Sequence, residues 1–180
     1  MGDLQGHDFR GNQWTGGGGA LAGHEDLHAL AGSPRVEVTS KNDTRLEFGV
    51  GGYYEPDTHT VVVPEGASPA VVTHELGHAL DQHLGMDKNT PFTATADFGV
   101  AYRIDQERMD VYDRQLLGRT SYFGKRLEAF AEAVAVARTG EGAGVRGERF
   151  TRSFPRVLAL VKEKLSGQPR STWTPPTRVR

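Results

Sequence analysis

Residues 71–84 read VVTHELGHALDQHL, which is a His-Glu-x-x-His motif inside an apolar helical pattern. If this stretch is a helix, His74 and His78 lie one turn apart on the same face, so both imidazoles can bind one metal ion. Glu75 projects beside that face, a position that suits a carboxylate contacting the metal-bound water rather than the metal. The stretch therefore predicts a zinc-binding helix in which Glu75 is a general base.

The composition limits what can surround this helix. At 180 residues with 37% apolar side chains, the chain can form one domain with a modest core and a short appendage. The formal charge of −2, from 23 acidic and 21 basic residues in no long run, predicts neither nucleic-acid binding nor attachment to acidic membranes. Cysteine is absent, so a metal site must use His, Asp or Glu.

No segment of the sequence has the pattern of a signal peptide or a membrane span. Residues 1–10 lack a basic segment followed by an apolar one, and no apolar run reaches the roughly 18 residues that a span needs. We therefore expect a soluble protein, cytoplasmic or virion-associated. A secreted protein without its signal, or one exported by another route, would have the same pattern.

Residues 1–34 predict a flexible leader, because they are rich in glycine and poor in apolar anchors. Their one dense segment, HDFRGNQW at 7–14, resembles short tags at the ends of phage and mobile-element proteins. In this segment, Phe9 and Trp14 can dock on the domain or bind a phage or host protein partner. A disordered tail with two aromatic residues is the alternative.

A second His-Glu-x-x-His motif lies in the leader, at residues 24–28. Glycines flank it and few apolar residues accompany it, whereas the motif at 74–78 lies among Val and Leu at helical spacing. A metal site needs a rigid, packed support for its ligands. We therefore interpret residues 24–28 as a solvated helical turn and not as the metal site.

The pattern between the two motifs favours strands. Residues 36–39 and 45–50 alternate between apolar and polar side chains, and residues 59–63 form a short β-branched run. We expect a small antiparallel sheet in which Tyr53-Tyr54 pairs with residues 60–63 as a hairpin.

Helical patterns make up most of the remaining sequence. Ser68 and Pro69 predict the N-cap and first position of the metal-binding helix. Further helices are expected at about 95–117, 125–138 and 155–165, with a flexible glycine-rich loop at 140–147 and Ser153 as a cap for the last helix.

Two histidines leave two positions of a tetrahedral zinc open, and a catalytic site fills one of them with a third protein ligand. The three-histidine pattern His-Glu-x-x-His-x-x-Gly-x-x-His fails, because Asp81 and Leu84 stand at its Gly and last His positions. His83 lies about 140° around the helix from His78, so we interpret it as a surface residue.

Glu128 is the better candidate for the third ligand. Glu128 and Glu132 lie four residues apart in a helix that is otherwise rich in Ala and Val. Burying two like charges is unfavourable unless something compensates them, and a dication with imidazoles beside it would do so. The alternative to a metal site is that both glutamates lie on a solvent-exposed face of the helix together with Lys125 and Arg138.

Three segments together resemble the catalytic core of the anthrax-lethal-factor-like metallopeptidases, which include the Pro-Pro endopeptidases. These segments are HELGHALD at 74–81, Ser121-Tyr122, and EAFAEA at 128–133. The resemblance extends from the strand at His59 to the helix near Leu165. It implies a zincin fold with zinc bound by the following residues: His74, His78 and Glu128.

The resemblance also implies roles around the metal. Glu75 is the base, Tyr122 donates a hydrogen bond to the oxyanion, and Glu132 supports the site. Tyr122 precedes Glu128 by six residues, where the family pattern has seven, so Tyr112 and Tyr102 are fallback candidates. Asp81 shares the histidine face, and either orients an imidazole or has a capping or surface role.

From these patterns we expect a single α+β zincin-like domain at 35–167, between the flexible leader at 1–34 and a disordered tail at 168–180. The expected function is zinc-dependent hydrolysis of peptide bonds in a protein or peptide substrate. One alternative is a phage or mobile-element accessory or assembly protein with a structural metal. Another is a protease that is restrained by its own leader or processes it.

Overall fold

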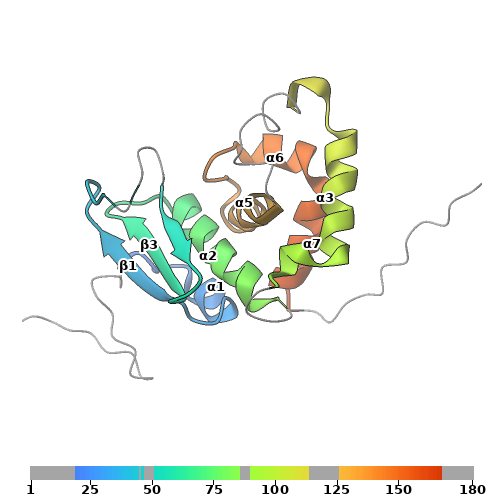
Figure 1. The fold of residues 1–180 in the computed structure, drawn as a ribbon. Coiled ribbons are helices and arrows are strands. Elements are labelled where there is room, and N and C mark those ends of the chain that lie inside the picture. The colour runs from blue at the N-terminus through green and yellow to red at the C-terminus, as the bar shows by residue number, and fades with distance from the viewer. Residues whose placement is uncertain (1–18, 45, 47–50, 86–89, 114–125, 168–180) are drawn as a thin grey trace, which may run out of the picture.

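The computed structural model describes residues 19–44, 46, 51–85, 90–113 and 126–167. The fold is α+β, as expected, with a small sheet on one side and most of the helices on the other (Figure 1). Helix α5 lies between α2, which packs beside the sheet, and the helices α3 and α7 (Figure 1). The elements in chain order are α1 (Glu25–Leu30), β1 (Arg35–Thr39), β2 (Tyr53–Glu55), β3 (Thr60–Pro64), α2 (Pro69–His83), η2 (Phe92–Ala94), α3 (Ala96–Arg108), α5 (Arg126–Thr139), α6 (Gly147–Ser153) and α7 (Pro155–Leu165).

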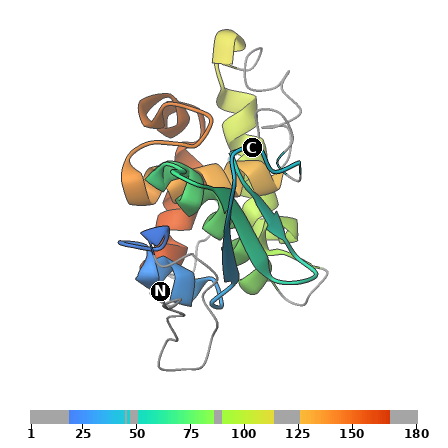
Figure 2. The ribbon, with the colours of Figure 1, turned by 90° about the vertical axis from the view of Figure 1, so that its left-hand side faces the viewer.

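The sheet has the strand order β1-β3-β2 and lies in front of the helices in Figure 2. The predicted hairpin is confirmed, because β2 pairs with β3 in antiparallel register, Tyr54 opposite Val61. The expectation of a fully antiparallel sheet was wrong: β1 pairs with β3 in parallel. Alternating side chains identify the buried face of a strand but not the direction of its neighbour. Of the strand pattern at 45–50, only Leu46 lies within the described residues.

The second half of the expected flexible leader belongs to the core. Leu21, Leu27 and Ala31 are buried, and α1 packs against α2. Arg138 on α5 also donates a hydrogen bond to the Asp26 carboxylate at 2.6 Å. A few apolar side chains are enough to hold this segment on the domain, because they cover apolar surface of α2 that would otherwise be exposed to water. The first half, residues 1–18, and the tail at 168–180 lie outside the described residues.

Helix α2, which carries the His-Glu-x-x-His motif at 74–78, begins as predicted. The Ser68 hydroxyl accepts a hydrogen bond from the Val71 backbone N–H at 3.3 Å, and Pro69 stands in the first turn. Nine residues of this helix are buried, since the sheet covers one side and α5 another. The helix is therefore held on two sides, which is the rigid support that a metal site needs.

The helix expected at 95–117 is shorter in the structure. It ends at Arg108 because the buried Met109 has an extended backbone, with φ −61° and ψ 135°. Asp110 then accepts a hydrogen bond from the Asp113 N–H at 2.7 Å, as the cap of a new helical turn does. Residues 114–117 lie outside the described residues.

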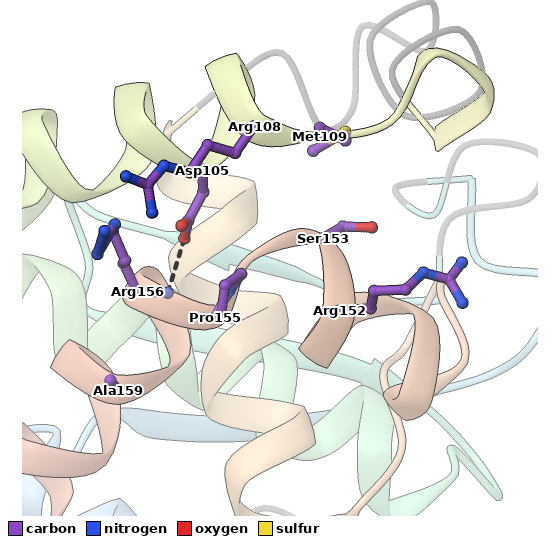
Figure 3. Close-up of a pocket in the computed structure, with 8 residues that line it drawn as sticks. All are labelled: Asp105, Arg108, Met109, Arg152, Ser153, Pro155, Arg156 and Ala159. Atoms are coloured by element: carbon purple, nitrogen blue, oxygen red, sulfur yellow. Dashed lines mark hydrogen bonds between the residues drawn. The ribbon is translucent and has the colours of Figure 1, made fainter.

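The helices expected at 125–138 and 155–165 are present as α5 and α7, and α6 was not predicted. The expected cap of α7 was wrong, because Ser153 ends α6 and donates to Asp113. Asp105 of α3 caps α7 instead. Its Oδ2 accepts a hydrogen bond from the backbone N–H of Arg156 at 2.9 Å (Figure 3). It also accepts one from the backbone N–H of Val157 at 2.9 Å. A cap from another helix cannot be found by local spacing.

Candidate metal centre

Helix α2 presents two imidazoles to one point. The rings of His74 and His78 lie with their centroids 4.9 Å apart and their planes at 82°. His74 is buried, and the side chain of His78 is 15% exposed. One ring is thus held in the interior while the other borders the solvent.

Glu128 of α5 reaches the same point. Its Oε2 lies 3.4 Å from Nε2 of His74 and 3.6 Å from Nε2 of His78. Zinc bonds of about 2.0–2.1 Å in tetrahedral geometry put neighbouring ligand atoms about 3.3 Å apart. Both distances are close to this separation of neighbouring ligand atoms. They are longer than the usual range of a direct hydrogen bond.

The three ligand atoms of His74, His78 and Glu128 all lie within 4.8 Å of one another. Among the described residues, no other group of three or more His, Asp or Glu side chains meets this condition. Two imidazoles and a carboxylate are donors that zinc and similar divalent metals accept. The chemistry and the spacing of the donors therefore fit a metal ion.

The electrostatics of the three residues also suit a cation. Burial works to lower the pKa of His74, but the Glu128 and Glu132 carboxylates outweigh it and raise the pKa to about 9. Burial works to raise the pKa of Glu128, and the two imidazoles outweigh it and lower the pKa to about 2. The site thus favours positive charge on His74, and a dication can replace that charge.

Glu132 lies one turn after Glu128 and is fully buried. Its Oε2 is 2.9 Å from Nδ1 of His74, the ring nitrogen opposite the ligand atom. The two glutamates therefore share a helix face but contact different nitrogens of one ring. This is the arrangement in which a carboxylate orients a histidine ligand.

Glu75 is 6% exposed and adjoins the two histidines. Burial raises the pKa of its carboxyl above the ordinary value, and the positive charge of His78 and His74 offsets part of this rise. A carboxylate with a raised pKa is a stronger base than an ordinary surface glutamate. On its other side Glu75 meets Gly52, where a Cβ would come within 3.0 Å of the Glu75 Cγ.

Asp81 has the capping role that the sequence left open. Its two carboxylate oxygens accept hydrogen bonds from the backbone N–H and the hydroxyl of Thr93, both at 2.8 Å. These bonds hold the start of η2 against α2. Of the roles that the sequence left open for Asp81, its hydrogen bonds correspond to capping, because both carboxylate oxygens accept from Thr93.

Tyr122 lies outside the described residues. The fallback tyrosines have other surroundings: Tyr112 is 69% exposed with the Arg149 guanidinium 5.2 Å from its ring centre. Tyr102 is buried, stacks on Phe98 and accepts a hydrogen bond from Gln106 at 2.8 Å. Tyr102 is therefore a packed core residue, whereas Tyr112 is a surface residue whose ring contacts Arg149.

The second His-Glu-x-x-His motif does not form a metal site. Nδ1 of His24 lies 3.3 Å from the Thr73 hydroxyl, and Nε2 of His28 lies 2.7 Å from the Pro34 carbonyl oxygen. Glu25 is exposed. The expectation of a solvated turn was wrong for His24, which is buried because α1 packs on α2. His83, at the end of α2, is exposed, as predicted.

Two features near the site were missed in the sequence. The loop expected to be flexible at 140–147 donates hydrogen bonds to Glu132, and Gly77 allows α5 to approach α2. The available signals were Gly77, a glycine inside a helical pattern, and the glycines of the predicted loop, including Gly142.

No protein-family model matches the chain, and no curated protein matches its sequence significantly. Within the described residues, no helix has the length and apolar character needed to cross a membrane.

Proposed function

We propose that this protein is a zinc metalloendopeptidase. The proposal is carried by one observation: Glu75 adjoins a group formed by His74, His78 and Glu128 that has the spacing of zinc ligands. Within the described residues the group offers three protein ligands, which leaves a position for water, whereas a structural zinc is closed by four. This count favours catalysis over the alternative of an accessory protein with a structural metal.

The chain's own residues divide the chemistry among them. His74, His78 and Glu128 would hold zinc, which lowers the pKa of a bound water and polarises a substrate carbonyl. Glu75 takes the proton of the attacking water and passes it to the leaving amine. Glu132 holds the ring of His74 through Nδ1. By resemblance to the lethal-factor-like metallopeptidases, Tyr122 donates a hydrogen bond to the oxyanion.

The test combines metal analysis with peptide cleavage. The purified protein should contain about one zinc per chain and cleave members of a peptide library in a reaction that a chelator stops and added zinc restores. Glu75→Gln should abolish cleavage and retain zinc, because Glu75 is not a ligand. Glu65→Gln, which changes an exposed glutamate just before α2, is the matched control and should cleave as the parent does.

Two outcomes would contradict the proposal. Cleavage by Glu75→Gln at the rate of the parent would remove Glu75 from the reaction. Stoichiometric zinc without cleavage of any peptide would favour the accessory or assembly function, in which the metal serves the fold alone.

A further inference from the structure

The loop between α5 and α6 surrounds the carboxylate of Glu132. The backbone N–H of Ala143 donates to Oε2 at 3.1 Å, and those of Gly144 and Val145 donate to Oε1 at 3.0 and 2.8 Å. Three consecutive amides thus point at one buried carboxylate. Consecutive N–H groups of this kind form an anion-binding concavity, here filled by a side chain of the same protein.

The loop is itself held in shape by its own hydrogen bonds. The N–H of Gly142 donates to the Val145 carbonyl at 3.1 Å, which closes the turn. The N–H of Gly147 donates to the Glu141 carboxylate at 3.1 Å, and the N–H of Glu141 donates to the Thr139 hydroxyl at 3.1 Å. The hydrogen bonds within the loop therefore hold the three amides in position independently of their contacts with Glu132.

At Gly142 the loop leaves no room for a side chain beside the Glu132 carboxylate. A Cβ at this position would lie 2.1 Å from Oε1 of Glu132 and 2.4 Å from the Val145 carbonyl oxygen. No side chain fits there unless the carboxylate moves or the turn opens. Because Glu132 is fully buried, its carboxylate has no solvent space into which it can move.

The bonds to Glu132 also decide how His74 is presented. Backbone amides can only donate, so two of them occupy Oε1 and one occupies part of Oε2. The remaining lone pair of Oε2 faces Nδ1 of His74 at 2.9 Å. A ring held through Nδ1 directs Nε2 towards Glu128, 3.4 Å away, where the proposed metal would lie.

We propose that the loop 142–145 is a positioning element of the metal site, and that Gly142 is the residue through which the loop sets metal affinity. The loop fixes the Glu132 carboxylate, Glu132 fixes the ring of His74, and the orientation of that ring sets how well the site binds zinc. This inference rests on the metal site of the proposed function. It does not depend on what the site catalyses.

The test is zinc affinity, measured by competition with a chromophoric chelator. Gly142→Ala should weaken zinc binding about 10- to 100-fold, the usual effect of disturbing a partner of a metal ligand. Gly140→Ala is the matched control: it changes a glycine of the same loop whose Cβ would meet no atom within 4 Å. Gly140 has φ +79°, so both variants can lose stability, but only Gly142→Ala should lose affinity.

A double variant tests whether the effect passes through Glu132. Glu132→Gln places an amide NH₂ among groups that only donate and should weaken zinc binding as well. If the loop acts through this side chain, adding Gly142→Ala to Glu132→Gln should weaken binding by far less than Gly142→Ala alone. Additive losses would contradict the inference.

If Gly142→Ala does not fold, Ala143→Pro removes one of the three amide donors instead. Zinc affinity equal to that of the parent in either folded variant would overturn the inference. A parent that binds zinc but cleaves nothing would overturn the peptidase proposal and leave this one standing, since only affinity is measured here.

Discussion

Gly77 of α2 packs against Ala131 of α5 so closely that a Cβ on Gly77 would lie 2.9 Å from the Ala131 Cα and 3.2 Å from its carbonyl oxygen. Gly77 stands between the two histidines, and Ala131 follows Glu128 by three residues. A close approach of the two helices therefore falls beside the group formed by His74, His78 and Glu128. A glycine inside a helix, normally a weakness, sets the separation of the candidate ligands.

Gly77→Ala should destabilise the protein, although alanine is the better helix former. The gain in helix propensity is about 0.5–1 kcal/mol, whereas overpacking a tight contact costs about 1–3 kcal/mol. Gly99→Ala in α3 is the control, because the nearest atoms to its Cβ would be those at the end of the flexible Arg126 side chain, from 3.2 Å. Thermal unfolding should show a lower Tm for Gly77→Ala and an equal or higher Tm for Gly99→Ala. The reverse order would show that the helices can separate freely.

Zinc should stabilise the folded protein through the motif on α2 and not through its twin on α1. A ligand at 100 times its Kd adds about 2.7 kcal/mol to the free energy of unfolding. Titration of the metal-free protein should raise Tm, and His78→Ala should remove the rise. His24→Ala combined with His28→Ala should keep the zinc-dependent rise, even if the loss of the buried His24 lowers the starting Tm. A rise lost in the double variant would place the metal on α1.

Gly52→Ala should lower turnover without releasing zinc. Its Cβ would lie 3.0 Å from the Glu75 Cγ and 2.9 Å from the Val62 carbonyl oxygen, so the proposed base has to shift. A misplacement of about 1 Å at the reacting groups costs about 100-fold in rate, so a smaller shift of Glu75 should still lower turnover measurably. The control is Gly51→Ala, whose Cβ would meet methyl groups of Val71 at 3.2 Å. Peptide cleavage and zinc content, measured on the same samples, check this prediction. Full activity of Gly52→Ala would show that residue 52 does not control the position of Glu75.

Asp113 should make stability depend on pH in the acidic range. Burial works to raise the pKa of Asp113, but hydrogen bonds from Arg149, Ser153 and Arg152 outweigh it and hold the pKa below the ordinary 3.8. Because the folded pKa is the lower one, the stabilisation is complete above the unfolded pKa and is lost as pH falls through the folded pKa.

Asp113→Asn should therefore lower the free energy of unfolding by about 1–3 kcal/mol at pH 7, as expected when a charged hydrogen-bond partner is removed. The difference from the parent should shrink as pH falls below 3.8. Urea unfolding at a series of pH values measures it. Asp57→Asn, at an exposed position in the turn between β2 and β3, is the control. A difference that stays constant down to the lowest pH would show that ionisation of the Asp113 carboxyl does not cause the pH dependence of stability.

Local patterns predicted the elements whose information is local. The spacing of His74, Glu75 and His78, with Ser68 and Pro69 before them, was sufficient for α2 and its cap, because helix periodicity and capping act within a few residues. The β2–β3 hairpin followed from a short turn between apolar strands for the same reason. The approach of Glu128 to the histidines was inferred from the cost of burying two carboxylates and from the resemblance, and the structure places these side chains together.

Only the tertiary structure decided how segments distant in the sequence combine. It made the sheet mixed, packed Leu27 of the expected leader into the core and placed Asp105 of α3 at the start of α7. It also separated the roles of two glutamates that look alike in sequence: Glu128 lies at the candidate metal position, and Glu132 is held by the amides of a loop. Residues four apart share a helix face by geometry alone, but what that face meets depends on which other segments pack against it.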